Sequence, residues 1–192
     1  MSSALPPLSE IQSHEDALNT TLTTLFESSP TLHEHLVPQV FAQLSTTRIS
    51  SYSELIDVSL HTISQWDDSL KAQFIAGHPR IGERKNLSQL SVKEQAAAAT
   101  PPEVLARLEV LNQCYERRYP GLRYITFVNG RSRAMIMEEM EDVLGLEKED
   151  RPEDDNATPM NPGGEAWTKE LERAVRDMGR IAKDRLKAMG VE

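Results

Sequence analysis

The chain has 192 residues, of which 39% are hydrophobic, and it carries a net charge of −9 and one cysteine. This length supports one buried core, so a single domain is expected. The negative charge argues against a nucleic acid or an anionic membrane as partner, because both reward clustered Lys and Arg. No apolar run approaches the ~20 residues of a membrane span. The expected partner is a small molecule or another subunit.

Two features bear on the cellular compartment. The single cysteine, Cys114, excludes an internal disulfide framework and a multi-cysteine metal site, and its apolar helical surroundings favour a buried thiol. The polar start, Met1–Ser13, lacks the basic and apolar regions of a signal peptide, and the C-terminus is not a peroxisomal SKL-type tail. We therefore expect a soluble cytoplasmic protein, with peroxisomal import by another route as the alternative.

Apolar residues recur at helical spacing along most of the chain, which predicts an all-α fold of one compact multi-helix domain. The first three predicted helices carry Leu18, Leu22, Leu25 and Phe26, then Leu36, Val40, Phe41 and Leu44, then Tyr52, Leu55, Ile56, Leu60 and Ile63. The later ones carry Val104, Leu108, Leu111 and Tyr115, then Ile136, Met140, Val143 and Leu144, then Trp167, Leu171, Val175, Met178 and Ala182.

Three helix starts carry the spacing of a capping box, in which a Ser or Thr and an acid three residues later bond each other's backbone amides. The pairs are Ser51 with Glu54, Ser91 with Glu94, and Thr100 with Glu103. Pro101 follows Thr100, and proline is common at the first helical position.

Two stretches break the helical pattern. Tyr124–Val128 resembles a strand and is closed by Asn129-Gly130, but a lone strand has no pairing partner. It is therefore predicted to be a short extended segment packed on helices. Residues 147–165 are rich in Glu, Asp, Pro and Asn, which predicts a mobile acidic loop inserted within the domain.

The segment Ala76–Glu83 follows a helical run and contains two glycines and a proline, which predicts a shaped loop. Pro79 disfavours helical angles at the preceding residue, so His78 is expected in extended backbone at a helix exit. An imidazole there can face a cavity and exchange protons near neutral pH. The alternative is a histidine that only caps the last carbonyls of its helix.

The segment Ser91–Gln95 has two interpretations. The capping box alone accounts for Glu94. A helix start also offers free amides to a polar ligand, and Gln95 adds a side-chain amide that can bind the same ligand. Both roles can coexist.

The last predicted helix places two cations differently. At 100° per residue from Leu171, Arg185 falls at about the edge of the apolar stripe, whereas Lys183 points about 120° away. A guanidinium at that edge requires an acidic side chain or an anionic ligand. Structural pairing with an acid and ligand binding are equal alternatives for Arg185.

No metal or cofactor motif is present. His33 and His35 are two positions apart, about 200° around a helix, so they cannot bind one ion. The chain also has no His-Glu-x-x-His, no glycine-rich phosphate loop and no Gly-x-Ser-x-Gly. Chemistry without a cofactor is expected.

Taken in order, these segments resemble the 2-oxo-4-hydroxy-4-carboxy-5-ureidoimidazoline (OHCU) decarboxylase family. The resemblance rests on Gly77–Glu83, Ser91-x-x-Glu94-Gln95, Leu111-Asn112 with Tyr115, Tyr124–Ser132, and Ile181-Ala182 with Arg185-Leu186. It implies an all-α homodimer without metal or cofactor. It also implies decarboxylation of a small ureide to (S)-allantoin in urate degradation.

Together with the residue patterns, the resemblance implies a site. The implied catalytic residues are His78 as proton carrier, Glu94, and Arg185 bound to the substrate. The implied substrate-binding residues are Pro79, Ser91, Val92, Lys93, Gln95, Tyr124, Ile125, Thr126, Phe127 and Val128. The chain departs from the family pattern at Gly77, where alanine is usual, at Tyr119–Leu122, which replaces Phe-Gly-Phe-Pro, and in the added acidic loop.

Two other functions fit parts of the sequence. A non-catalytic helical interaction module would use the His-Pro loop and the capping boxes only as architecture, with the acidic loop binding a partner. A hydrolase of the preceding ureide step would act on the same kind of ring with a positioned water and would release no carbon dioxide.

Overall fold

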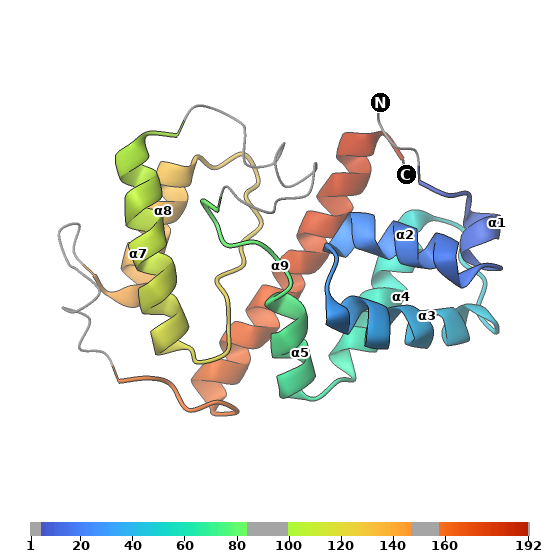
Figure 1. Ribbon diagram of the computed structural model, residues 1–192, viewed down its shortest axis with the longest axis horizontal. Helices are drawn as coiled ribbons and strands as arrows, with labels where there is room; N and C mark the ends of the chain where they lie inside the picture. Colours follow the sequence, from blue (N-terminus) through green and yellow to red (C-terminus); the bar gives the residue numbers. More distant parts are fainter. Residues whose placement is uncertain (1–4, 84–99, 147–157, 192) are drawn as a thin grey trace. The chain divides into compact units, whose positions relative to one another are not determined.

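The computed structural model describes residues 5–83, 100–146 and 158–191. Within these ranges all regular structure is helical and no strand occurs, which confirms the predicted all-α fold. The elements are α1 (Leu8–Ile11), α2 (Glu15–Phe26), the π-helix η1 (Leu32–Leu36), α3 (Val37–Leu44), α4 (Tyr52–Ser64), α5 (Asp68–Ile75), α7 (Pro102–Arg118), α8 (Arg133–Leu144) and α9 (Glu165–Met189) (Figure 1). None of these helices combines the length and the apolar character that crossing a membrane requires.

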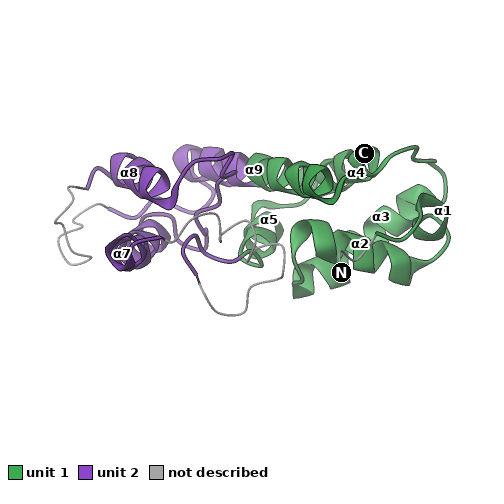
Figure 2. Cartoon of the chain, turned by 90° about the horizontal axis from the view of Figure 1, so that it is seen from above, with its two compact units in different colours: residues 1–78, 175–192 green, residues 79–174 purple. Residues whose placement is uncertain are grey.

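The chain forms two compact units, coloured separately in Figure 2. Unit 1 comprises Met1–His78 and Val175–Glu192, and unit 2 comprises Pro79–Ala174. The boundary falls inside α9, so this helix contributes residues to both units. The single domain expected from the sequence stays a prediction.

In unit 1 the predicted apolar faces form the core. The fully buried residues include Leu18, Leu22 and Leu25 of α2, Leu55, Ile56 and Ile63 of α4, and Met178 and Ala182 of α9. Helices α4 and α9 pack closely, because a Cβ added to Gly179 would lie 2.6 Å from Cδ1 of Leu60. Lys183 of α9 forms an ion pair with Asp57 of α4 at 2.7 Å.

The capping boxes have different outcomes. Ser51 caps α4 by accepting a hydrogen bond from the backbone N–H of Glu54, as predicted, and the Glu54 carboxylate accepts the backbone N–H of Ser50. The box at Thr100 is wrong: Pro101 is the N-cap residue and α7 begins one residue later than expected, at Pro102. The Thr100 hydroxyl instead accepts a hydrogen bond from Arg133 of α8.

Unit 2 is built on α7 and α8, which lie side by side (Figure 1). Arg107 of α7 and Glu141 of α8 join them through an ion pair of 2.7 Å between largely buried side chains. Cys114 of α7 is fully buried, as predicted for a structural thiol. Within the described part of unit 2 the connection from α7 to α8 is irregular, so Tyr124–Val128 forms no strand.

The predicted acidic loop falls partly outside the described residues, which resume at 158. Residues 158–164 are non-helical, and the backbone N–H of Met160 bonds to the carbonyl of Arg118 at the end of α7. Helix α9 already begins at Glu165, the last residue of the predicted loop.

Candidate functional site

His78 lies three residues after the end of α5 and is the last residue of the first segment of unit 1. Its backbone N–H donates to the carbonyl of Ile75, the last residue of that helix. The side chain is 3% exposed, and its ring meets the ring of Phe74 edge-on at 6.3 Å between centroids. The predicted helix exit is therefore confirmed, and the imidazole lies in the interior of the unit.

The residue before His78 is a glycine for a steric reason. A Cβ at Gly77 would lie 2.6 Å from Cβ of Ser29, well inside ordinary contact distance. Ser29 is itself held in place, because its hydroxyl accepts the backbone N–H of Leu32 at the start of η1. The chain at His78 and the chain between α2 and η1 thus lie in direct contact within unit 1.

The end of α2 and the residue that follows it bind Arg185. The Arg185 side chain is 3% exposed and donates to Glu27 at 2.6 Å and to the carbonyls of Thr24 and Leu25 at 3.2 Å. The predicted contrast with Lys183 is confirmed, since only Arg185 of the two faces the core. Its acidic partner in the fold is Glu27, a residue that sequence reasoning did not identify.

Glu27 contacts one of the two predicted catalytic residues that the structure describes, and its loop lies against the neighbour of the other. It pairs with Arg185, and two residues later Ser29 touches the glycine next to His78. Its backbone has φ 67° and ψ 150°, a conformation that is essentially restricted to glycine. Glycine would suit this backbone better but would lack the carboxylate that pairs with Arg185.

Five predicted site residues lie outside the described part of the chain. They are Ser91, Val92, Lys93, Glu94 and Gln95, together with the capping box that they were predicted to form. Their roles stay predictions.

The predicted binding segment Tyr124–Val128 lies in unit 2, between α7 and α8. Tyr124 and Ile125 are buried, whereas Thr126, Phe127 and Val128 are partly exposed. The predicted turn follows it, with positive φ at both Asn129 and Gly130 and a hydrogen bond from Arg131 N–H to the carbonyl of Val128. The segment therefore has irregular backbone and ends in a tight turn.

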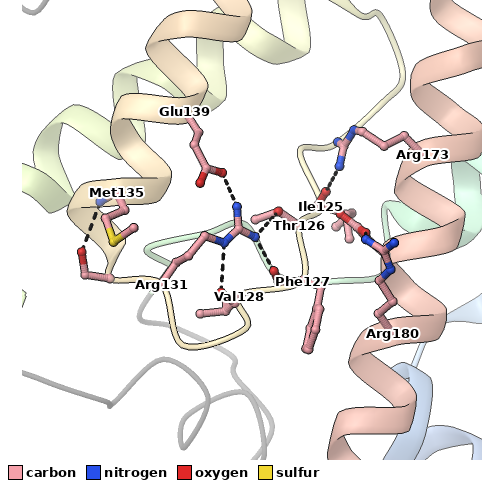
Figure 3. A network of polar contacts seen from close by, with 11 residues as sticks. Ile125, Thr126, Phe127, Val128, Arg131, Met135, Glu139, Arg173 and Arg180 are labelled. Atoms are coloured by element: carbon pink, nitrogen blue, oxygen red, sulfur yellow. Dashed lines mark hydrogen bonds and ion pairs between the residues drawn. The ribbon is translucent and has the colours of Figure 1, made fainter.

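Two arginines bind this segment from two sides, as Figure 3 shows. Arg131 follows the turn, donates to the carbonyls of Phe127 and Val128 and to the hydroxyl of Thr126, and forms an ion pair with Glu139 of α8. Arg173 of α9 donates to the carbonyl of Ile125 at 2.7 Å. These bonds fix backbone carbonyls that no strand partner holds.

Arg173 is in turn held by buried acidic and aromatic groups. Its guanidinium bonds to both carboxylate oxygens of Glu170, at 2.6 and 2.8 Å, and lies 5.3 Å from the ring centre of Tyr124. The hydroxyl of Tyr115 donates to the same carboxylate. Burial and the negative charge of Glu170 raise the pKa of Tyr115, so the phenol stays protonated and serves as a donor.

The loop after His78 is held by α7 within unit 2. Arg80 forms a two-pronged ion pair with Glu116, and the Asn112 side-chain amide donates to the carbonyl of Ile81. This pair raises the pKa of Arg80, chiefly through its hydrogen bond with Glu116. Pro79 begins the loop and is partly exposed.

The histidines of η1 have structural surroundings. The two ring nitrogens of His33 bond to Asn19 and Ser28, and the ring of His35 lies edge-on to that of Trp66. The described residues hold no group of three or more His, Cys, Asp or Glu side chains that fits a metal ion.

One comparison with known proteins identifies a family. A sequence model of the family described as OHCU decarboxylase matches residues 12–158. That range includes His78 and Tyr124–Val128 but ends before Arg185. A search among curated protein sequences found no match.

Two solved structures are similar to the chain in fold. A crystal structure of (S)-allantoin synthase matches with a TM-score of 0.56 at 17% identity, covering 96% of this chain and 54% of that one. This chain therefore spans about half the length of that protein. A crystal structure of OHCU decarboxylase in the presence of (S)-allantoin matches with a TM-score of 0.55 at 19% identity, covering 88% of this chain and 96% of the other.

Proposed function

The chain belongs to the OHCU decarboxylase family, a family of carboxy-lyases, and we propose that it converts 2-oxo-4-hydroxy-4-carboxy-5-ureidoimidazoline to (S)-allantoin. The observation that carries this proposal is the match over residues 12–158, which includes the buried His78 and its His-Pro loop. The two solved structures, whose names refer to the same chemistry, support the proposal through their fold.

The proposed reaction requires no external electron sink. The substrate carries a carboxylate and a hydroxyl on one ring carbon, next to a ring carbon that is doubly bonded to nitrogen. When the bond between the ring carbon and the carboxylate breaks, carbon dioxide leaves and the electron pair of that bond moves into the ring. A proton then adds to one face of the ring and sets the S configuration. The tasks of the protein are orientation and proton transfer, for which we propose no cofactor.

His78 is the proposed proton carrier. An imidazole has an ordinary pKa near ~6.5, so it can both donate and accept a proton at neutral pH. Burial to 3% exposure keeps bulk water from the ring, which favours transfer to the substrate rather than to solvent.

The binding roles are divided among the remaining site residues. We assign contacts with the ureido and ring N–H groups to Glu94 and Gln95, within the binding stretch Ser91–Gln95. The backbone of Tyr124–Val128 binds the flat ring edge, with Pro79 beside the catalytic histidine. Arg185 binds a ring carbonyl or the carboxylate and retains Glu27 as its partner in the fold.

The remaining parts of the proposal concern assembly and location. We propose a homodimer in the cytoplasm that binds a small ureide. Sedimentation of the purified protein tests the first point, and microscopy of the tagged chain tests the second.

The test of function uses freshly made substrate. Urate oxidase and hydroxyisourate hydrolase generate the unstable ureide from urate in the cuvette, and circular dichroism follows allantoin formation after the chain is added. Rapid appearance of the S enantiomer is the expected result. Racemic allantoin at the spontaneous rate, from protein shown to be folded, would refute the decarboxylase activity.

A further inference from the structure

The contacts of the binding segment point to a residue of α9 outside the set predicted from the sequence. We propose that Arg173 is a positioning residue for substrate binding, because it fixes the peptide group between Ile125 and Thr126. This inference rests on the proposed function, in which the backbone of Tyr124–Val128 binds the substrate ring.

The argument begins with the geometry of one peptide group. The described peptide groups are trans and planar, so the C=O and N–H of one group point in opposite directions. Arg173 donates a hydrogen bond to the carbonyl of Ile125 at 2.7 Å, so this C=O points toward the guanidinium. The N–H of Thr126 therefore points away from the guanidinium. None of the described residues accepts a hydrogen bond from that N–H.

No pairing with a neighbouring strand fixes the orientation of this peptide group in the described part of the chain. In a sheet, neighbouring strands hold the peptide groups, but no strand occurs in the described residues of either unit. Arg131 holds the next carbonyls, those of Phe127 and Val128, from the side of α8 (Figure 3). Arg131 also binds the side chain of Thr126, but among the described residues it is Arg173 that bonds the carbonyl of the peptide group between Ile125 and Thr126.

Arg173 is itself well fixed, which a positioning residue requires. Glu170 binds its guanidinium through both oxygens, and Tyr115 of α7 donates to the same carboxylate. Burial alone would lower the pKa of Arg173, but the bonds to Glu170 outweigh it and the pKa is raised. The guanidinium stays charged and planar at every pH at which the protein is folded.

The chain offers a matched control on the same helix. Lys169 of α9 also pairs with an acid one turn away, Glu165, at 2.6 Å, but its side chain is 72% exposed. The corresponding side-chain exposure of Arg173 is 29%. The variants Arg173→Ala and Lys169→Ala both remove one cation and one ion pair within α9, and only the first removes a bond to the binding segment.

The experiment combines kinetics with hydrogen exchange. In Arg173→Ala we expect the KM for the ureide to rise about tenfold with kcat lowered less than about twofold, since one substrate-binding donor loses its orientation. Amides of peptides covering residues 124–128 should also exchange faster by mass spectrometry. Lys169→Ala should match the wild type in both measurements.

A conservative variant guards against a folding defect. Arg173→Lys keeps a cation beside Glu170 but lacks the planar fork that reaches both Glu170 and Ile125, so its KM should lie between those of wild type and Arg173→Ala. Unchanged KM in the folded alanine variant, or unchanged exchange at residues 124–128, would overturn the role of Arg173. Inactivity of the wild type would instead overturn the proposed function, and this inference with it.

Discussion

Gly77 and Ser29 lie so close that a Cβ added to the glycine would be 2.6 Å from Cβ of the serine. The family commonly has alanine at the position of Gly77, so this chain combines a smaller residue there with a close approach of the neighbouring loop. We expect Gly77→Ala to destabilise the protein by about 1–3 kcal/mol, the usual cost of overpacking. Chemical unfolding measures this difference.

A double-variant cycle isolates the contact between these two residues. Ser29→Gly removes the opposing Cβ, so Gly77→Ala should cost less in that background than in the wild type. Ser29→Ala keeps the Cβ and should leave the cost of Gly77→Ala in place. Equal costs in all three backgrounds would show that this contact is not the source of the destabilisation.

The second prediction concerns His78. General acid–base catalysis contributes roughly 10²- to 10⁴-fold, so His78→Ala should lower the rate of (S)-allantoin formation by about that factor. Thermal unfolding should show that the variant remains folded. His33→Ala serves as the control, because His33 is an exposed histidine of unit 1 that bonds only to surface groups, Asn19 and Ser28. An undiminished rate in His78→Ala would remove this residue from the mechanism.

The third prediction separates the two roles of Arg185. Arg185→Met leaves the buried carboxylate of Glu27 without its cation, which typically costs about 3–5 kcal/mol of stability. The double variant Glu27→Gln/Arg185→Met removes both charges and should recover most of that stability. Its KM for the ureide should nevertheless stay well above that of the wild type. A double variant with both wild-type stability and wild-type KM would assign Arg185 a purely structural role.

The fourth prediction concerns pH and the start of α4. Hydrogen bonds from the backbone N–H and the hydroxyl of Ser50 hold the pKa of Glu54 below its usual 4.5. A carboxyl group whose pKa is lower in the folded state than in the unfolded state stabilises the protein at pH values above the unfolded-state pKa. This stabilisation is lost as the pH falls through the folded-state pKa. Glu54→Gln should therefore lower Tm at pH 7.

The Tm difference between wild type and Glu54→Gln should shrink as the pH is lowered below 4.5. Thermal unfolding between pH 3 and pH 7, monitored by circular dichroism, provides the comparison. Because Glu54 is exposed, added salt should also reduce the difference. A pH-independent Tm difference would show that the carboxylate charge is not what stabilises this helix start.

The predictable parts of this molecule are those that depend on neighbouring residues. Helical spacing of apolar residues located α2, α3, α4, α7, α8 and α9, and Asn129-Gly130 located the turn after the binding segment. The same periodicity placed Arg185 toward the core. Each of these features is set within a few turns of chain, where spacing determines which side chains share a face.

The contacts that complete the site depend on distant pairs. Glu27 and Arg185 are 158 positions apart, and Arg173 and Ile125 are 48 apart, so no local pattern connects them. The error at Thr100 has the same origin, since its hydroxyl bonds to Arg133, 33 positions away, instead of capping α7. Where a polar side chain has two possible partners, the tertiary structure determines which of them it bonds. The spacing of residues in the sequence does not give that information.

The backbone of Glu27 has a consequence for any attempt to make this protein more heat-resistant. Its φ of 67° with ψ of 150° suits glycine, and such backbone strain costs about 1–3 kcal/mol. Glycine at this position would relieve the strain but leave the buried Arg185 without its acidic partner, which typically costs about 3–5 kcal/mol. A search for heat-resistant variants should therefore retain glutamate at position 27, because the ion pair outweighs the strain.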